Sequence, residues 1–191
     1  LHVLSRQGAQ VIDLEGLANH RGSALGRRGE QPAQKGFETA LVSALAGLDP
    51  SRPVVVEAES SKIGNINLPP RFFETMRTAP RVVIEAPLKE RATFLARVYA
   101  DVLEDRRAFN ERLDKLVRLQ GRDTVEGWKA AIAEGRFVDV AADLIERHYD
   151  PRYKKARDRV GGGILAVITA DSLGENGLDT LANRVAAAVT K

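Results

Sequence analysis

The sequence has no cysteine among its 191 residues. That absence excludes disulfide bonds, thiolate metal ligands and a cysteine nucleophile within this chain. It also has no apolar run of the ~18–20 residues that a membrane-spanning helix needs. The opening residues, LHVLSRQGAQ, lack the charged segment and the long apolar stretch of a signal peptide. We therefore expect a cytoplasmic protein.

The formal net charge is only +3, so positive and negative charges nearly balance. Such a small average excess says little about binding partners. With 43% hydrophobic and 29% charged residues, the composition is that of an ordinary soluble globular protein. The length fits one domain, or one domain with an appendage.

Four short apolar runs rich in β-branched residues predict strands: Gln10–Leu14, Pro53–Ala58, Arg81–Ala86 and Gly163–Thr169. None alternates strictly between apolar and polar residues, which is typical of parallel strands covered on both faces. Helical patterns occupy Leu1–Gly8, Gln34–Leu48, Arg71–Arg77 and Asn176–Val189. In the second of these helices we expect Phe37, Leu41 and Leu45 to face inward. This alternation of strands and helices indicates βαβ units.

The middle of the chain breaks that rhythm. From Leu88 to Arg159 only amphipathic helical patterns occur, at Glu90–Leu119, Thr124–Glu134 and Val138–His148. We interpret residues 88–159 as a helical insertion and Gly161–Gly163 as the hinge back into the sheet. The predicted fold class is α/β: an open parallel sheet of the P-loop kinase type, residues 1–87 and 160–191, with a large helical insertion.

The phosphate-binding motif GxxxxGK[ST], which such a sheet normally carries, does not occur. The chain begins with Leu1 rather than Met, inside a helical pattern that has no capping residue before it. We therefore expect a truncated sequence, with the first strand and the phosphate loop upstream of Leu1.

Polar clusters follow the predicted strands, at the edge where open α/β sheets bind ligands. The first cluster holds Asp13, Glu15, Asn19, His20, Arg21 and Ser23, and the second holds Glu57, Glu59, Ser60, Ser61, Lys62 and Gly64. Glu85 ends the third strand, and Lys89, Arg91 and Arg97 begin the insertion. This mixture of acids and bases suits a phosphorylated ligand, with a divalent cation such as Mg²⁺ held by Asp13 or Glu57.

Each of these residues also has a structural interpretation. Asp13 and Glu15 can cap the next helix, and His20 can be a loop histidine with a backbone partner. An apolar run followed by an acid, as at Glu57, is common, and arginines between Arg91 and Arg118 are typical of a solvated helix face. Both interpretations stay open on the sequence alone.

The segment Arg147–Arg159 (RHYDPRYKKARDR) concentrates basic charge, with six Lys or Arg residues against two Asp residues. Aromatic residues lie between the basic ones, a combination found in nucleic-acid contacts and also on plain surfaces. The candidate contact residues are Arg147, Tyr149, Arg152, Tyr153, Lys154, Lys155 and Arg157.

The runs QVIDLEGLANHRGSALG, QPAQKGFE, VEAESSKIGNINLP, APLKERA and HYDPRY occur in this order along nearly the whole chain. Together they resemble the C-terminal P-loop domain of bacterial tRNA 2-selenouridine synthases. Ser61 departs from the pattern, since a basic residue is often expected there. The resemblance implies an N-terminal rhodanese-like domain with an essential cysteine, which would be a partner of this chain.

The resemblance also implies a transferase that acts on the 2-thiouridine at the wobble position of certain tRNAs. A geranyl group from geranyl diphosphate first alkylates the sulfur, and selenophosphate then displaces the S-geranyl group. On this basis we expect catalytic roles for Asp13, Glu15, His20, Arg21 and Glu57. We expect substrate or phosphate binding by Asn19, Ser23, Glu59, Ser60, Lys62 and Arg91, and tRNA binding by the Arg147–Arg159 segment.

Two rival functions remain: a small-molecule kinase with an arginine-rich lid, and a non-catalytic module that docks tRNA. If the family chemistry holds, a chain without a cysteine and a phosphate loop is expected to be inactive by itself.

Overall fold

The computed structural model describes residues 1–23, 25–58, 60–157 and 161–190, without the side chains of residues 104 and 155–157. The chain divides into two compact units. The sheet unit comprises Leu1–Glu85, Gly161–Thr169 and Glu175–Lys191, and the helical unit comprises Ala86–Val160 and Ala170–Gly174. No helix within the described ranges is long and apolar enough to cross a membrane.

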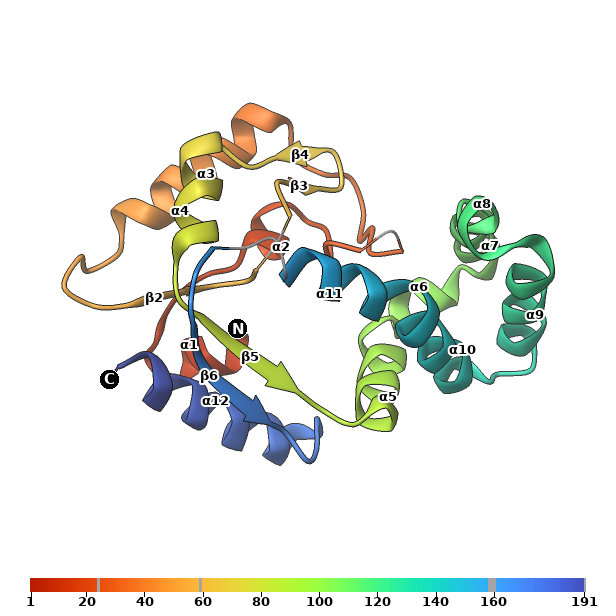
Figure 1. Ribbon diagram of the computed structural model, residues 1–191. Helices are drawn as coiled ribbons and strands as arrows, with labels where there is room; N and C mark the ends of the chain where they lie inside the picture. The colour runs from red at the N-terminus through yellow and green to blue at the C-terminus, as the bar shows by residue number, and fades with distance from the viewer. Residues whose placement is uncertain (24, 59, 158–160, 191) are drawn as a thin grey trace. The chain divides into compact units, whose positions relative to one another are not determined.

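Among its described residues, the sheet unit contains three separate pairs of strands (Figure 1). Strands β1 (Gln10–Ile12) and β2 (Val54–Val56) are parallel, as are β5 (Arg81–Glu85) and β6 (Ile164–Thr169). The four predicted strands therefore exist and pair in parallel. The expected single open sheet is not confirmed, because within the described residues β2 and β5 each pair with one strand only. The upstream strand and phosphate loop stay a prediction.

The first core of the sheet unit lies between β1, β2 and the helices beside them. Helix α3 (Gln34–Ala46) buries Phe37 and Leu41, whereas Leu45 is 41% exposed and was wrongly expected to face inward. Helices α1 (His2–Arg6), α2 (Leu14–Leu17) and α4 (Pro70–Thr78) complete this part of the unit. The fully buried residues of the core are Ile12, Leu14, Ala18, Phe37, Leu41, Ile63, Ile66 and Leu68.

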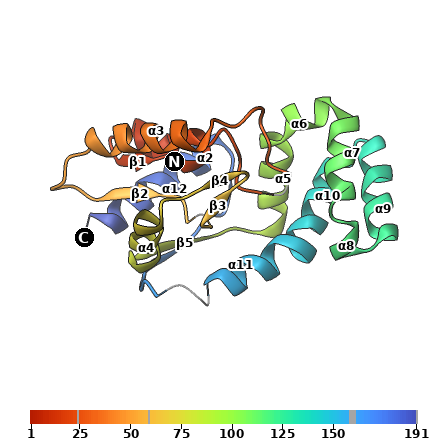
Figure 2. The same cartoon turned by 90° about the horizontal axis from the view of Figure 1, so that it is seen from above.

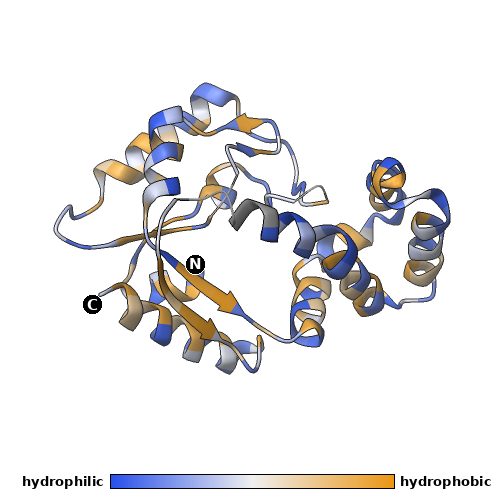
Figure 3. Cartoon of the chain, viewed as in Figure 1, coloured by the Kyte–Doolittle hydropathy of each residue, from blue (hydrophilic) through white to orange (hydrophobic). Residues whose placement is uncertain are grey.

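Helix α12 (Glu175–Val189) covers one face of β5 and β6 and buries Leu181 and Val185 (Figure 1). The other face of β6 is apolar but open, with Leu165 47% exposed and Val167 53% exposed. Figure 3 shows this apolar character along both strands. The chain reaches β6 through Gly162, whose N–H donates to the Arg77 carbonyl at 3.1 Å.

The helical unit is built from short helices that pack side by side (Figure 2). They are α5 (Leu88–Val98), α6 (Ala100–Glu104), α7 (Arg106–Asp114), α8 (Val117–Gln120), α9 (Arg122–Ala133) and α10 (Phe137–Leu144). The single helical pattern predicted for Glu90–Leu119 is therefore wrong. Asp105 breaks it, since its side chain accepts the Ala108 N–H at 3.0 Å and starts α7 as an N-cap.

Two elements near the end of the insertion depart from the predicted pattern. Val138–His148 was expected to be one ordinary helix, but its last residues belong to the π-helix η1 (Ile145–Tyr149). It leads directly into α11 (Asp150–Arg157), so the basic segment is helical. A π-helical turn has a wider hydrogen-bonding pattern than an α-helix and often marks a functional position.

The sequence analysis also missed a small hairpin, β3 (Lys62–Ile63) and β4 (Ile66–Asn67), because strands of two residues have no readable periodicity. Two glutamine side chains hold it. Gln34 donates to the Asn67 carbonyl at 2.8 Å and accepts the Asn67 N–H at 2.9 Å, as a neighbouring strand would. Gln31 accepts the Asn65 N–H at 2.7 Å and donates to the carbonyls of Ile63, at 3.1 Å, and Ala18, at 2.9 Å.

Three of the sequence runs therefore meet around Gly64: QVIDLEGLANHRGSALG, QPAQKGFE and VEAESSKIGNINLP. The residue has φ +60°, and a Cβ placed on it would lie 2.2 Å from Gln31 Oε1 and 2.7 Å from His20 Cδ2. Gln31 cannot move away without losing the hydrogen bonds that hold the hairpin. A glycine is therefore required here both by the backbone and by its neighbours.

We predict that Gly64→Ala lowers the free energy of unfolding by about 2–4 kcal/mol, the sum of left-handed backbone strain and overpacking. Gly8→Ala is the matched control, because Gly8 has φ +86° but nothing within 4 Å of a Cβ. That control should cost only the backbone strain, about 1–2 kcal/mol. Urea denaturation measures both values, and equal losses would contradict the close packing at Gly64.

Candidate functional site

The carboxylates of Asp13 and Glu57 form the centre of the candidate site. Because Ile12 and Val56 are paired in the parallel register of β1 and β2, the residues that follow them leave the two strands at the same edge. The two carboxyl groups interact closely enough to shift each other's pKa in opposite directions. Two adjacent carboxylates repel each other unless one keeps a proton, so the pair holds one proton below about pH 7.

Backbone N–H groups of α2 fix both carboxyl groups. Asp13 is the N-cap of this helix and accepts the Gly16 N–H at 2.8 Å. Glu57 accepts the N–H of Leu14 at 3.0 Å through Oε2 and that of Glu15 at 3.4 Å through Oε1. The capping interpretation of Asp13 is thus confirmed, and it is compatible with a role in chemistry because the same carboxyl group contacts Glu57.

The two carboxyl groups differ in their affinity for the proton. Burial, followed by the hydrogen bond with Asp13, raises the pKa of Glu57 from its ordinary 4.5 to about 7, and the Leu14 N–H opposes this rise. Burial also acts to raise the pKa of Asp13, but its hydrogen bonds with Glu57 and Gly16 leave that pKa below its ordinary value. The charges of His2 and Arg28 lower the pKa of Asp13 as well, and His2 Nε2 lies 3.6 Å from Asp13 Oδ2. Below about pH 7 the proton of the pair therefore resides on Glu57, and above about pH 7 Glu57 is ionised and can accept a proton.

The loop after α2 places the remaining residues of the first polar cluster. His20 is buried, at 8% exposed, and pairs with Arg27 in an isolated antiparallel bridge. The half-buried Arg21 donates its N–H to the Gly26 carbonyl at 2.8 Å, and the Ser23 N–H donates to the Arg21 carbonyl at 2.7 Å. These hydrogen bonds turn the chain tightly after His20, and the turn fixes the backbone that carries the His20 and Arg21 side chains.

Asn19 and the second polar cluster have structural contacts. Asn19 has a positive φ of 48°, and its Nδ2 donates to the Glu30 carbonyl at 2.9 Å. Ser60 Oγ donates to the Lys62 carbonyl at 2.6 Å, and the Lys62 side chain is exposed at the start of β3. Glu59 lies outside the described residues.

Arg91 belongs to the helical unit, where it forms a two-pronged ion pair with Asp150. Its Nη1 and Nη2 donate to the two carboxylate oxygens at 2.7 and 2.9 Å. The hydrogen bond to Asp150 raises the pKa of Arg91 above its ordinary value. This pair ties α5 to the first residue of α11.

The basic segment presents its side chains along η1 and α11. Arg152, Tyr153 and Lys154 are exposed, and Tyr149 stacks on Tyr153 with ring centroids 6.3 Å apart. Arg147 is exposed but donates to the Asp143 carboxylate. The side chains of Lys155 and Arg157 lie outside the described ones.

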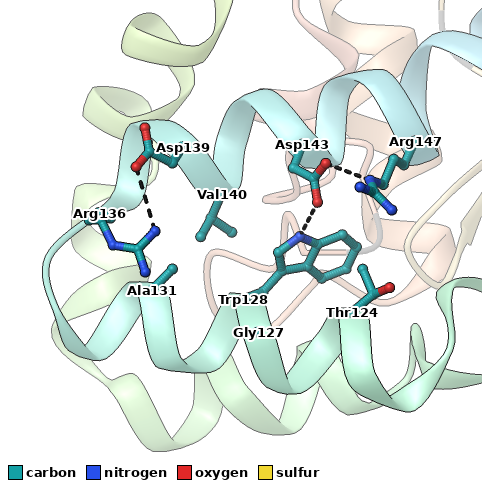
Figure 4. Close-up of a pocket in the computed structure, with 9 residues that line it drawn as sticks. All are labelled: Thr124, Gly127, Trp128, Ala131, Arg136, Asp139, Val140, Asp143 and Arg147. Carbon is teal, nitrogen blue, oxygen red and sulfur yellow. Dashed lines mark hydrogen bonds and ion pairs between the residues drawn. The ribbon is translucent and has the colours of Figure 1, made fainter.

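A cavity of about 340 Å³ lies between α9 and α10 (Figure 4). Its wall includes Trp128, whose Nε1 donates to Asp143 Oδ2 at 2.7 Å, and the ion pair of Arg136 with Asp139. Of the predicted site residues only Arg147 lines it. Neither carboxyl group of the pair lines the cavity, and its polar groups largely satisfy one another.

The expected divalent cation finds few ligands at the carboxyl pair. No group of three or more His, Asp or Glu residues able to hold a metal ion occurs in the described part of the chain. A cation at Asp13 and Glu57 would have to displace the shared proton and the N–H groups that now occupy the oxygens. The arrangement fits a proton better than a metal ion.

Sequence reasoning missed the two hairpin-binding glutamines and the buried side chains behind the basic segment. Gln31 lies just before α3 and Gln34 is the first residue of that helix, positions where glutamine usually indicates only surface exposure. His148 is 2% exposed, and Asp150 binds Arg91. Both lie within a segment whose charge suggested a fully solvated surface.

We predict that Glu57 makes stability depend on pH between about 4.5 and about 7. In this window the unfolded chain has released the Glu57 proton and the folded chain has kept it, so the free energy of unfolding falls as pH rises. Relative to Glu57→Gln, the native chain should lose on the order of 1–2 kcal/mol across the window, after allowance for solvent screening.

Urea denaturation at about pH 5 and about pH 8 measures this difference. Glu85→Gln, at the end of β5, is the matched control and should change the pH dependence little. A constant difference between the native chain and Glu57→Gln would show that Glu57 does not retain a proton.

Comparison with known proteins identifies the family of the chain. Residues 2–134 match the family described as "tRNA 2-selenouridine synthase AAA domain". Proteins named tRNA 2-selenouridine synthase are similar in sequence. The one from Alcanivorax borkumensis is 32% identical over 83% of this chain and 52% of its own length. The one from Hahella chejuensis is 37% identical over 80% of this chain and 35% of its own length.

A third relative, from Chromohalobacter salexigens, is 46% identical over 48% of this chain and 25% of its own length. The chain thus spans between a quarter and about half of the length of these relatives. No solved structure matches it. Because the family match covers more than half of the residues, the chain belongs to the tRNA 2-selenouridine synthase AAA-domain family.

Proposed function

We propose that this chain is the part of a tRNA-modifying transferase that carries out group transfer at wobble 2-thiouridine. The reaction converts 2-thiouridine to 2-selenouridine through an S-geranyl intermediate, with geranyl diphosphate and selenophosphate as substrates. The relatives' printed name supports the tRNA modification. The observation that carries the chemical role is the proton-sharing pair of Asp13 and Glu57.

The first transfer step must release a proton. The sulfur of 2-thiouridine forms a bond to the allylic carbon, the carbon–oxygen bond to diphosphate breaks, and N3 loses its hydrogen because C2 and N3 become doubly bonded. A base with a pKa of about 7, as Glu57 has, is well matched to accept this proton at neutral pH. In the second step the selenium of selenophosphate bonds to C2, the bond from C2 to the geranyl thiolate breaks, and the same group can return a proton to that thiolate. Water then takes the phosphoryl group from selenium as phosphate, and its proton restores the hydrogen on N3.

The diphosphate leaving group needs positive charge or N–H donors. We assign this role to Arg21 and Arg28 in the loop after α2, with Lys62 of β3 as a further cation of the same unit. Arg28 lies near enough to Asp13 to lower the pKa of that group. Ser23, Ser60 and the Asn19 amide provide polar contacts in the same loops. Arg91, which is held by Asp150, is proposed as a phosphate contact of the helical unit.

We predict that Glu57→Gln reduces geranyl transfer by about 10²–10³-fold in the full chain joined to its proposed rhodanese-like partner. Glutamine keeps an oxygen for the Leu14 N–H but cannot accept a proton. The native rate should rise with pH to a plateau with a midpoint of about 7, and the variant should lose this dependence. Mass spectrometry of the tRNA nucleosides measures the S-geranyl product.

The matched control is again Glu85→Gln, which should keep the native rate and its pH profile. Unchanged turnover of Glu57→Gln would reject Glu57 as the base. It would also favour the rival function, a module that only docks tRNA.

We further propose that tRNA docks on the exposed row formed by Arg152, Tyr153 and Lys154 beside the half-buried Tyr149, with Lys155 and Arg157 continuing it in sequence. Tyr149 and Tyr153 stack on each other and offer aromatic surface to unpaired bases. Arg152 and Lys154 are exposed and suited to phosphate contacts.

We predict that Arg152→Glu with Lys154→Glu weakens tRNA binding and reduces the slope of affinity against salt by about two, one for each lost phosphate contact. Lys115→Glu with Arg118→Glu, which changes the net charge equally on another exposed part of the helical unit, should have a smaller effect. Fluorescence anisotropy with 2-thiouridine tRNA at several salt concentrations measures both. Equal effects of the two double variants would mean that binding follows net charge alone.

A further inference from the structure

The side chain of His148 is the most deeply buried polar group of the helical unit among the described residues, at 2% exposed. Both ring nitrogens have neighbours. Nδ1 lies 3.3 Å from the Gln120 side-chain amide at the end of α8, and Nε2 lies 3.1 Å from Arg152 Nη1 on α11. The ring therefore links a helix earlier in the sequence to the exposed row of α11.

The guanidinium decides the state of the ring. An arginine side chain is always protonated and only donates, so Nε2 of His148 must be the acceptor of its N–H. A doubly protonated ring has no acceptor and would repel Arg152. Burial first, and the charge of Arg152 second, lower the pKa of His148, which agrees with a neutral ring. The proton then lies on Nδ1. Gln120 places its Nε2 beside Nδ1 and donates to the Arg147 carbonyl at 3.4 Å, so it accepts the Nδ1 proton when its amide is turned over and gives up that long bond.

The neighbours of His148 support the same geometry. The π-helical turn of η1 contains His148 and Tyr149, and the Tyr149 ring meets the His148 ring edge-on at 5.0 Å. Two residues later, Asp150 is held by both terminal nitrogens of Arg91. Where η1 joins α11, three consecutive side chains, the buried His148 and the half-buried Tyr149 and Asp150, are thus packed or paired, and the exposed residues 151–154 follow directly after them.

We propose that His148 is a positioning residue that accepts a hydrogen bond from Arg152 and holds this arginine for contact with a tRNA phosphate. The inference rests on the proposed docking of tRNA to α11. An exposed arginine loses side-chain freedom when it binds a phosphate, and a fixed acceptor reduces that loss before binding occurs. His148 itself touches no RNA.

A double-variant cycle in the full chain tests this role, with 2-thiouridine tRNA as the probe. Arg152→Ala should weaken tRNA binding roughly three- to tenfold, as expected for one phosphate contact. His148→Phe keeps a flat ring but removes the acceptor, and it should weaken binding in the native background and have no further effect beside Arg152→Ala. His148→Gln places an oxygen near the position of Nε2 and should restore most of the affinity.

The matched control is the same cycle with Lys154→Ala, because Lys154 lies on the same helix and has no contact with His148 among the described ones. There the effects of His148→Phe and Lys154→Ala should multiply. Multiplying effects in the Arg152 cycle as well would overturn the positioning role. If Arg152→Ala itself leaves the affinity unchanged, the proposed docking surface fails instead.

A measurement on the native chain avoids any folding defect of the variants. The nitrogen chemical shifts of the His148 ring at neutral pH should report a neutral ring with the proton on Nδ1. Arg152→Ala should change the Nε2 shift, because the charged donor is gone. A charged ring, or a proton on Nε2, would overturn the proposal.

Discussion

The proton shared by Asp13 and Glu57 is the interaction on which the edge of the β1–β2 pair depends. Two carboxylates placed side by side by a parallel register repel each other unless one keeps a proton. With the proton between them, each carboxyl group still has an oxygen for the N–H groups of α2. That helix in turn fixes the start of the loop with His20. The local electrostatics of two residues therefore determines how a long polar loop leaves the sheet unit.

The glutamine contacts to the hairpin are the second set of interactions that supports this loop. Gln34 binds the hairpin edge as a strand would, and Gln31 joins three parts of the chain through one amide. An amide can do this because it donates and accepts at the same time, which a carboxylate or an ammonium group cannot. The hairpin is too short to be stable alone, so these side chains supply the hydrogen bonds that a wider sheet would provide. The polar motifs that were separate in the sequence thus become one supported surface.

The predictable parts of the fold are those set by local composition. The four β-branched runs are strands, because β-branched residues favour extended backbone without help from distant residues. The helical pattern predicted for Glu90–Leu119 runs across positions where the actual helices end. The spacing of apolar residues continues through a short interruption such as that at Asp105, so the sequence pattern does not reveal the break. At the site, Asp13 and Glu57 could be found from their place after strands. Their shared proton could not, because it depends on the register of β1 and β2. Gln31 and His148 were not recognised because Gln31 binds Ala18 and Ile63, and His148 is buried against Gln120, all of them distant in the sequence.

The carboxyl pair also meets a conflict that the proposed reaction creates. Positive charge is needed for the diphosphate, but positive charge beside a base lowers its pKa and weakens it. The positive charges change the pKa of the two carboxyl groups differently. The charges of His2 and Arg28 act on Asp13, whereas burial and Asp13 itself dominate at Glu57. Asp13 stays ionised, and its negative charge keeps the proton affinity of Glu57 high. Two carboxyl groups with different surroundings thus take different roles, and the base keeps its strength next to the cations that the leaving group requires.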